Sequence, residues 1–442
     1  MKKAIYIPAY SDGLMGMFYG KSDKEIAEAN QPDFDKKKSL RIYNRDFDAY
    51  FHNPYILISA GTSWRKKDFR KTIHAENSNV FVDSGGYNLA HGTVDPKKFT
   101  DKVALEWSEE NGDVFPILDR PSFTLHLKKN PDDPNCKEMK SPYKDYQECL
   151  DLSVKSAKYY TENRTRSDTI VLNVLQGLTV LEIEQWYKEI SQYEFEGWAY
   201  GGTNGNLGRI LPALKFLLQH GELERESCKM FHIFGVTSNE SMIYFQYIQM
   251  ILENMGFNIQ ITYDSTYWNR TCVYGNYMTK PRYIVGLGME AMNWPNSINY
   301  KEMSKDFKLP CKCPVCLDLK DTYSFFNNYK VDEKSMVAPM QGCGEEIIVF
   351  GKFNNMIAFH NLYLQLEYLE NVNRIFGSGM KDVYNEFFPK KVVDNFDLID
   401  RYFAKLDNKE VEAEVNDRFL QGHLKKTKKA LVSTMSEAPT VF

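Results

Sequence analysis

The chain has 442 residues, of which 43 % are hydrophobic and 14 % aromatic, enough apolar material for one large domain with an appendage or for two or three domains. This composition excludes an intrinsically disordered chain, and the longest apolar runs fall well short of a membrane span. The formal net charge of −4 does not by itself indicate a nucleic-acid-binding protein, although an overall charge can conceal local basic patches.

The N-terminal segment 1–8 lacks the long apolar stretch and the small-residue cleavage site of a signal peptide. Three of the eight cysteines, Cys311, Cys313 and Cys316, crowd into six residues. This uneven spacing favours a metal site in a reducing compartment over a disulfide framework. We therefore expect a cytoplasmic protein with no membrane partner.

Short apolar runs alternate with longer helical patterns through the first two thirds of the chain. The predicted strands are residues 4–8, 55–60, 80–83, 114–118, 169–175, 197–200, 230–236, 259–264 and 283–287. The predicted helices are residues 98–111, 143–162, 181–193, 207–219 and 241–255. This alternation is typical of an α/β fold with a parallel sheet, and about eight units predict a closed (β/α)8 TIM-type barrel. A doubly wound open sheet is the alternative, but no Gly-x-Gly-x-x-Gly follows the first strand.

The alternation of strands and helices breaks down near residue 290. We predict three parts: a catalytic barrel over residues 1–290, a zinc-binding subdomain with the last barrel helix over 291–375, and a C-terminal helical extension and tail over 376–442.

Polar and glycine-rich segments follow six of the predicted strands. These segments are 83–87, 119–121, 176–177, 200–202, 235–237 and 264–265. Any one of them could be an ordinary turn. Because the carboxyl ends of barrel strands meet on one face, where barrel active sites lie, the whole set indicates a site.

Cys311, Cys313 and Cys316 offer three thiolates that can share one tetrahedral zinc ion. The fourth ligand is either His360 or Cys343, and the sequence leaves both open. Four protein ligands close the coordination sphere, so we expect a structural Zn²⁺ and not a catalytic one.

Asp83 and Asp264 each end a predicted strand. Two carboxylates on one barrel face suit chemistry at an anomeric carbon, where one attacks C1′ and the other transfers protons.

The segment after Asp83 suits the binding of a flat ligand. Gly85 and Gly86 allow close approach of the backbone, and Tyr87 offers a flat ring. Other strand ends supply donors and acceptors for a purine edge. The full set of predicted substrate-binding residues is Ser84, Gly85, Gly86, Tyr87, Asp119, Gln176, Gly201 and Gly202.

Taken in order, these motifs resemble the tRNA-guanine transglycosylase superfamily over roughly residues 55–375. The matching segments are Asp83-Ser84-Gly85-Gly86-Tyr87, Leu175-Gln176-Gly177, Tyr200-Gly201-Gly202, the His232–Val236 segment, Tyr263-Asp264 and the cysteine pattern with His360. The resemblance implies a (β/α)8 barrel with a zinc subdomain. It also implies exchange of a guanine in a polynucleotide for a 7-deazaguanine through a covalent intermediate.

The resemblance also implies individual roles. Asp264 is the expected nucleophile at C1′, Asp83 the acid/base that serves the leaving and incoming bases, and Tyr87 the stacking platform. Asp119, Gln176 and Gly202 are the expected base-recognition groups. The implied zinc ligands are Cys311, Cys313, Cys316 and His360.

The departures from the family point to its DNA-acting branch. Bacterial tRNA enzymes read Asp-Ser-Gly-Gly-Phe-Gln, whereas here Tyr87 and Asn88 end the motif. The Pro-Thr-Arg stretch that helps them read the tRNA loop is absent from residues 265–271, and the Glu that selects an aminomethyl arm is absent from residues 203–207. The spacing from Cys316 to His360 is also longer than is typical, which keeps Cys343 open as a ligand.

We therefore expect a cyano-substituted, preQ0-like 7-deazaguanine to be inserted into DNA, as in phages and bacterial modification islands; for a phage protein the compartment is the host cytoplasm. The partners are then DNA and the free base, with a homodimer or accessory proteins left open. Exchange on tRNA is the first alternative. A non-catalytic nucleic-acid-binding subunit and a barrel glycosidase are alternatives of other classes. The basic segment 65–71 is the first choice for phosphate contact.

Overall fold

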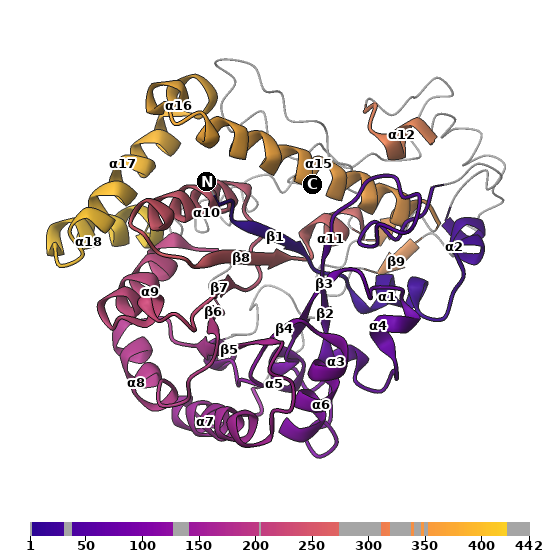
Figure 1. The fold of residues 1–442 in the computed structure, drawn as a ribbon, viewed down its shortest axis with the longest axis horizontal. Coiled ribbons are helices and arrows are strands. Elements are labelled where there is room, and N and C mark those ends of the chain that lie inside the picture. The colour runs from indigo at the N-terminus through magenta and orange to yellow at the C-terminus, as the bar shows by residue number, and fades with distance from the viewer. Residues whose placement is uncertain are drawn as a thin grey trace, which may run out of the picture.

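The computed structural model describes residues 2–30, 38–126, 141–202, 205–273, 311–318, 337–339, 346–348 and 352–421. Eight parallel strands in these residues form one sheet in the order β1-β8-β7-β6-β5-β4-β3-β2 (Figure 1). Their bounds are β1 Ile5–Pro8, β2 Tyr55–Ser59, β3 Asn79–Asp83, β4 Val114–Pro116, β5 Ile170–Leu175, β6 Gly197–Tyr200, β7 Met230–Ile233 and β8 Gln260–Ser265.

The sheet curls into a nearly closed barrel. The first strand pairs with the last, with Ile7 opposite Asp264. The remaining seam, between β1 and β2, is bridged where the Tyr10 N–H donates to the Leu57 carbonyl oxygen at 3.0 Å. An open doubly wound sheet would leave its two edge strands far apart, so the predicted (β/α)8 fold class is confirmed.

Helices alternate with the strands and surround the sheet (Figure 1). Those of the barrel are α1 Asp12–Phe18, α2 Asp23–Asn30, α3 Ala60–Ser63, α4 Phe69–Thr72, α5 Gly86–Ala90, α6 Asp101–Asn111, η1 Ser122–His126, α7 Tyr146–Asn163, α8 Val180–Ile190, α9 Leu207–Gln219, η2 Glu222–Glu224, α10 Asn239–Asn254 and α11 Tyr267–Val273. All five predicted helices are present among them.

The predicted and observed bounds differ where a capping residue or a special backbone angle intervenes. The helix predicted from residue 98 begins only at Asp101, because the Thr100 side chain accepts the Val103 N–H as an N-cap. The strand predicted to reach residue 236 ends at Ile233, because Gly235 adopts a left-handed φ of +67° that no strand contains.

One contact between two rings shows which side chains point into the barrel. Phe81 on β3 and His232 on β7 lie 5.7 Å apart between ring centroids, although three strands separate them in the sheet. These two side chains therefore meet across the barrel interior. Because side chains alternate along a strand, Asp83, two residues after Phe81, points into the same space at the end of β3.

The C-terminal part continues outside the barrel with α12 Pro314–Asp318, the antiparallel pair β9 Val337–Pro339 and β10 Glu346–Ile348, α15 Lys352–Gly377, α16 Lys381–Phe387, α17 Lys390–Ala404, α18 Lys409–Val415 and η5 Asn416–Gln421. Helix α15 packs on α10 and α11, α17 packs on α10, and η5 packs on α9 (Figure 1). The predicted strand 283–287, Cys343 and the tail beyond 421 lie outside the described residues, and the three domain boundaries remain predictions. Within the described residues, every helix is too short or too polar to cross a bilayer.

Candidate functional site

Asp83 lies at the carboxyl end of β3, held by groups from neighbouring segments. The Ser59 hydroxyl at the end of β2 donates to Asp83 Oδ2 at 2.9 Å. Burial raises the pKa of the Asp83 carboxyl above its ordinary value, the Asp264 charge raises it further, and the hydrogen bond from Ser59 opposes both. A carboxyl in this setting keeps a proton to higher pH than a free aspartate and suits a general acid.

Asp119 is a second buried carboxyl at the same end of the barrel. The Gln176 amide donates to Asp119 Oδ2 at 2.7 Å, and the Ser84 hydroxyl donates to Asp119 Oδ1 at 3.3 Å. Burial raises the pKa of Asp119 to about 6, with the Asp83 charge adding to the rise. Asp119, Gln176 and Ser84, all predicted from the sequence to bind the substrate, therefore form one hydrogen-bonded group.

Asp264 at the end of β8 is held at one oxygen. The Gly235 N–H donates to Asp264 Oδ1 at 3.0 Å, and His232 Nε2 lies 3.4 Å from the same oxygen. The other ring nitrogen of His232, Nδ1, is 2.8 Å from the Thr262 hydroxyl. Within the described residues no donor reaches Asp264 Oδ2, which leaves this oxygen available to a ligand.

The ring of Tyr87 is half exposed, with a relative exposure of 52 %. It lies nearly parallel to the ring of Phe123 on η1, at 22° and 6.4 Å between centroids. A Cβ atom added to Gly202 would fall 2.6 Å from Phe123 Cδ1, so the Phe123 ring packs directly on the Gly202 backbone. Two aromatic rings and a glycine backbone therefore gather beside the carboxylates.

The close approach at Gly86 is tighter than any other residue would allow. A Cβ atom there would come within 2.4 Å of the Asp119 carbonyl oxygen. This contact joins the segment after β3 to the segment after β4, and it explains why a glycine stands at this position.

These contacts place the sequence-predicted residues in relation to one another. Asp83 senses Asp264 electrostatically, Asp119 bonds Gln176 and Ser84, and Gly201 lies close to Gln176, with a Cβ there 3.2 Å from its Nε2. We call this end of the barrel, with Asp83, Asp119, Gln176 and Asp264, the barrel mouth.

Several side chains that shape the barrel mouth had no role predicted from the sequence: Ser59, Phe123, His232 and Thr262. Two of them carry a signal that could have been used. His232 and Thr262 are polar residues at interior positions of buried strands, with exposures of 1 % and 0 %. A polar side chain in such a place needs a partner, so it marks a site.

The metal-binding prediction is supported by geometry. The Sγ atoms of Cys311, Cys313 and Cys316 and a ring nitrogen of His360 all lie within 4.8 Å of one another. His360 is on α15 and is completely buried, with its Nδ1 3.2 Å from the Sγ atoms of Cys313 and Cys316. The pKa of the Cys311 thiol is lowered, mainly by a hydrogen bond from Cys313, which favours the thiolate. This Cys3His cluster could bind a metal ion such as zinc.

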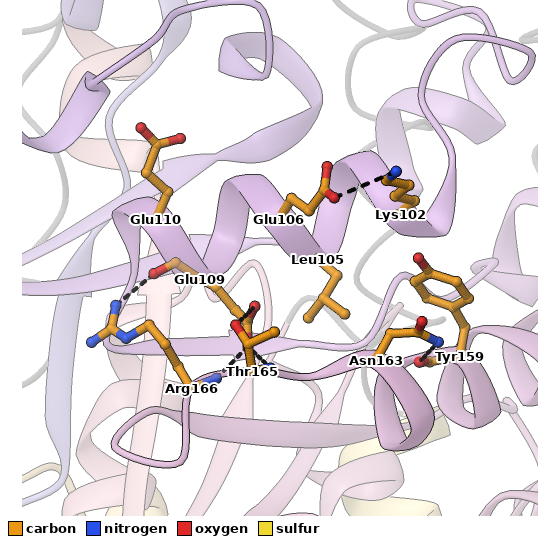
Figure 2. A pocket seen from close by; sticks show the side chains of 9 residues that line it. All are labelled: Lys102, Leu105, Glu106, Glu109, Glu110, Tyr159, Asn163, Thr165 and Arg166. Atoms are coloured by element: carbon orange, nitrogen blue, oxygen red, sulfur yellow. Dashed lines mark hydrogen bonds and ion pairs between the residues drawn. The ribbon is translucent and has the colours of Figure 1, made fainter.

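A separate pocket of about 550 Å³ lies between α6 and α7 (Figure 2). Glu109 at its floor accepts hydrogen bonds from the Thr165 N–H at 2.7 Å, the Thr165 hydroxyl at 2.8 Å and the Arg166 N–H at 2.8 Å. The carboxylate thus fastens the turn after α7 and is satisfied by the protein itself. We assign this pocket no part in the candidate site.

The basic segment 65–71 divides into two kinds of side chain. Arg70 forms an ion pair with Asp113 at 2.7 Å, and Lys66 forms one with Asp12 at 3.1 Å. The others are exposed and form no ion pair within the described residues: Arg65, Lys67 and Lys71.

Comparison with known protein families found no family model that matches this chain, and no curated protein matches it either.

Proposed function

We propose that this protein is a base-exchange transglycosylase of the tRNA-guanine transglycosylase superfamily, in its DNA-acting branch, that replaces a guanine with a preQ0-like 7-deazaguanine. The observation that carries the proposal is the unequal treatment of two carboxylates at the barrel mouth. Asp83 has a raised pKa and suits proton transfer, while Asp264 is anchored at Oδ1 and receives no hydrogen bond at Oδ2 from the described part of the chain.

In the proposed reaction, Asp264 Oδ2 forms a bond to C1′ of the nucleotide as the bond from C1′ to the base nitrogen breaks. The electron pair of that bond stays on the departing base, which takes a proton from Asp83. The incoming deazaguanine then gives a proton to Asp83 and displaces Asp264 from C1′. Asp83 ends the cycle protonated, as it began.

The aromatic pair supports a planar base as the ligand. Tyr87 and Phe123 are nearly parallel, with 6.4 Å between ring centroids, and offer aromatic faces on which a flat base can stack. The Asp119–Gln176 pair supplies a carboxylate acceptor and an amide at the barrel mouth, which suits the Watson–Crick edge of a guanine.

The Cys3His cluster supports a structural zinc ion held by Cys311, Cys313, Cys316 and His360. Bound there, the ion would tie α12 to α15, which packs on the barrel helix α11. Its four protein ligands leave no open position for substrate, so the chemistry belongs to the barrel mouth.

Two observations support a nucleic-acid substrate. The first is the set of departures from the tRNA-enzyme motifs. The second is that Arg65, Lys67 and Lys71 are exposed and form no ion pair with any residue that the structure describes. In this proposal they contact phosphates, so binding weakens as salt rises. A guanine within duplex DNA has to leave the stack to reach the barrel mouth.

The decisive experiment incubates the protein with DNA or with tRNA and with labelled guanine or 7-cyano-7-deazaguanine. Expected are label in the DNA and a denaturant-resistant protein–DNA adduct, both lost in Asp264→Asn. The matched control is Asp397→Asn, since Asp397 is an exposed carboxylate on the outer helix α17.

Each other outcome replaces the proposal with a named alternative. Exchange on tRNA alone moves the substrate to tRNA. Binding with neither adduct nor exchange indicates a non-catalytic subunit, and release of free sugar without exchange indicates a glycosidase.

A further inference from the structure

His232 is a buried histidine whose two ring nitrogens face different partners. The side chain is 1 % exposed, and its Nε2 forms no hydrogen bond of good geometry among the described residues. The charged atom facing Nε2 is Asp264 Oδ1, at 3.4 Å. Catalytic contacts of this length in a substrate-free site shorten when the reacting complex forms.

Thr262 decides which nitrogen carries the proton. Its hydroxyl is fully buried, and its one hydrogen-bond partner in the described chain is His232 Nδ1, at 2.8 Å. If Nδ1 carried the proton, the lone pair on Nε2 would face the lone pairs of an ionised Asp264, which is repulsive. If the Thr262 hydroxyl donates to Nδ1, Nε2 carries the proton and can donate it to Asp264 Oδ1 when the 3.4 Å contact shortens.

Among the described side chains near Asp264, His232 is the one that contacts Oδ1. Tyr6, the other polar ring near Asp264, donates its hydroxyl to the Ser265 carbonyl oxygen at 3.3 Å. Gly235 supplies a backbone N–H to Asp264 Oδ1 at 3.0 Å, from a left-handed φ of +67°. Asp264 Oδ1 is thus flanked by two donors, while Oδ2 faces none in the described residues.

We propose that Thr262 and His232 form a positioning relay, in which Thr262 holds His232 as the Nε2–H tautomer and His232 orients Asp264 so that Oδ2 attacks. This inference rests on the proposed function. When Oδ2 bonds to C1′ and the base leaves with its electron pair, Oδ1 becomes the carbonyl oxygen of the ester. Gly235 N–H and His232 Nε2–H remain beside that oxygen throughout, so their part in the step is to orient the carboxylate with Oδ2 toward C1′.

Two substitutions of His232 separate the relay from simple packing. In His232→Gln the amide nitrogen takes the place of Nε2 and keeps a donor for Asp264. In His232→Asn the shorter amide keeps the contact with Thr262 but does not reach Asp264. We expect the single-turnover rate of adduct formation to fall about 10²-fold in His232→Asn, because the nucleophile is no longer oriented, and to stay within about 10-fold of the original in His232→Gln. The dissociation constant for DNA should change less than about 2-fold in both.

The relay is overturned if His232→Asn forms the adduct at the rate of the original protein. It is also overturned if His232→Asn and His232→Gln are both folded and lose the same fraction of that rate. If the unsubstituted protein forms no adduct with DNA or tRNA, the proposed function has failed, which is a different result. The tautomer is read independently by ¹⁵N NMR of histidine-labelled protein without substrate, with the signal assigned through Thr262→Val, which removes the hydroxyl. A proton on Nδ1 overturns the relay even if the His232 variants do not fold.

Discussion

The barrel mouth and the Cys3His cluster both gather polar side chains in buried surroundings, but they leave their ligand atoms in opposite states. In the cluster, four donor atoms from α12, its preceding residues and α15 converge within 4.8 Å and point at one another. At the barrel mouth, the described residues hold Asp264 at Oδ1 and not at Oδ2, and Asp83 and Asp119 have raised pKa values. Four donor atoms around one point suit a structural ion, whereas carboxylates with unfilled hydrogen-bonding capacity can interact with a ligand.

Substituting a cysteine of the Cys3His cluster tests whether this cluster holds a structural metal, and it should have the largest effect of the proposed substitutions. We expect Cys316→Ser to lose the bound zinc and to lower the free energy of unfolding by about 5 kcal/mol or more, since binding of a structural metal is coupled to folding. Elemental analysis and chemical denaturation measure the two effects. Cys228→Ser is the matched control, because Cys228 is a buried free cysteine outside the cluster. Unchanged metal content in Cys316→Ser would contradict the assignment.

Asp83→Asn tests the role of the barrel mouth and should change activity much more than stability. The amide cannot deliver a proton, so the single-turnover rate of adduct formation should fall about 10²–10⁴-fold. The pKa of Asp83 is raised, so this carboxyl keeps its proton to higher pH than a free aspartate and loses it as the pH rises through that pKa. The rate should therefore decline as the pH rises through the pKa of Asp83 in the original protein. A pH–rate profile for Asp83→Asn that kept this decline would assign the proton to another group.

Phe123 tests whether the barrel mouth, unlike the Cys3His cluster, binds a ligand, because an aromatic ring can stack on a base only where a base can enter. Phe123→Leu keeps most of the volume and removes the aromatic face opposite Tyr87. We expect the dissociation constant of the free base to rise about 10–100-fold, which corresponds to the loss of about 1–3 kcal/mol of stacking. Isothermal titration with 7-cyano-7-deazaguanine measures this constant. Phe195→Leu, at a buried ring elsewhere in the barrel, is the control.

Asp119→Asn should give the smallest effect and one of opposite sign. The folded protein keeps the Asp119 proton up to about pH 6, whereas an unfolded aspartate releases it near the ordinary value of 3.8. The folded state therefore binds more protons between these values, and this group lowers stability as the pH rises through that window. We expect Asp119→Asn to raise the free energy of unfolding by on the order of 1–2 kcal/mol at pH 7.

The gain from Asp119→Asn should nearly vanish at pH 4, where the carboxyl is protonated in both states. Urea unfolding at the two pH values measures the difference. A gain that is the same at both would show that desolvation of the charge is not its cause.

Much of the fold could be predicted because it depends on local patterns. Eight of the nine predicted strands appear in the sheet, and the helix predicted over 207–219 has those bounds in the structure. The ninth strand lies outside the described residues. The errors in the bounds arise from single contacts, such as the Thr100 cap and the left-handed Gly235, that a hydrophobic pattern does not contain.

The candidate site was predictable in its location more than in its chemistry. Strand-end polar residues marked the barrel mouth, because parallel strands must present their carboxyl ends on one face. The basic segment 65–71 shows the limit of this reasoning. As sequence it is one run of charge, whereas in the structure Arg70 is committed to Asp113 and Lys66 to Asp12.

By itself, the sequence determined the strand–helix alternation, the carboxylates at the ends of β3 and β8, and the cysteine spacing of the metal site. Only the tertiary structure decided that His360 completes the donor cluster, that Phe123 faces Tyr87, and that His232 and Gly235 hold one oxygen of Asp264. The physical reason is that these contacts join segments far apart in the chain. Their distances depend on how the barrel closes, and no local pattern of residues encodes that closure.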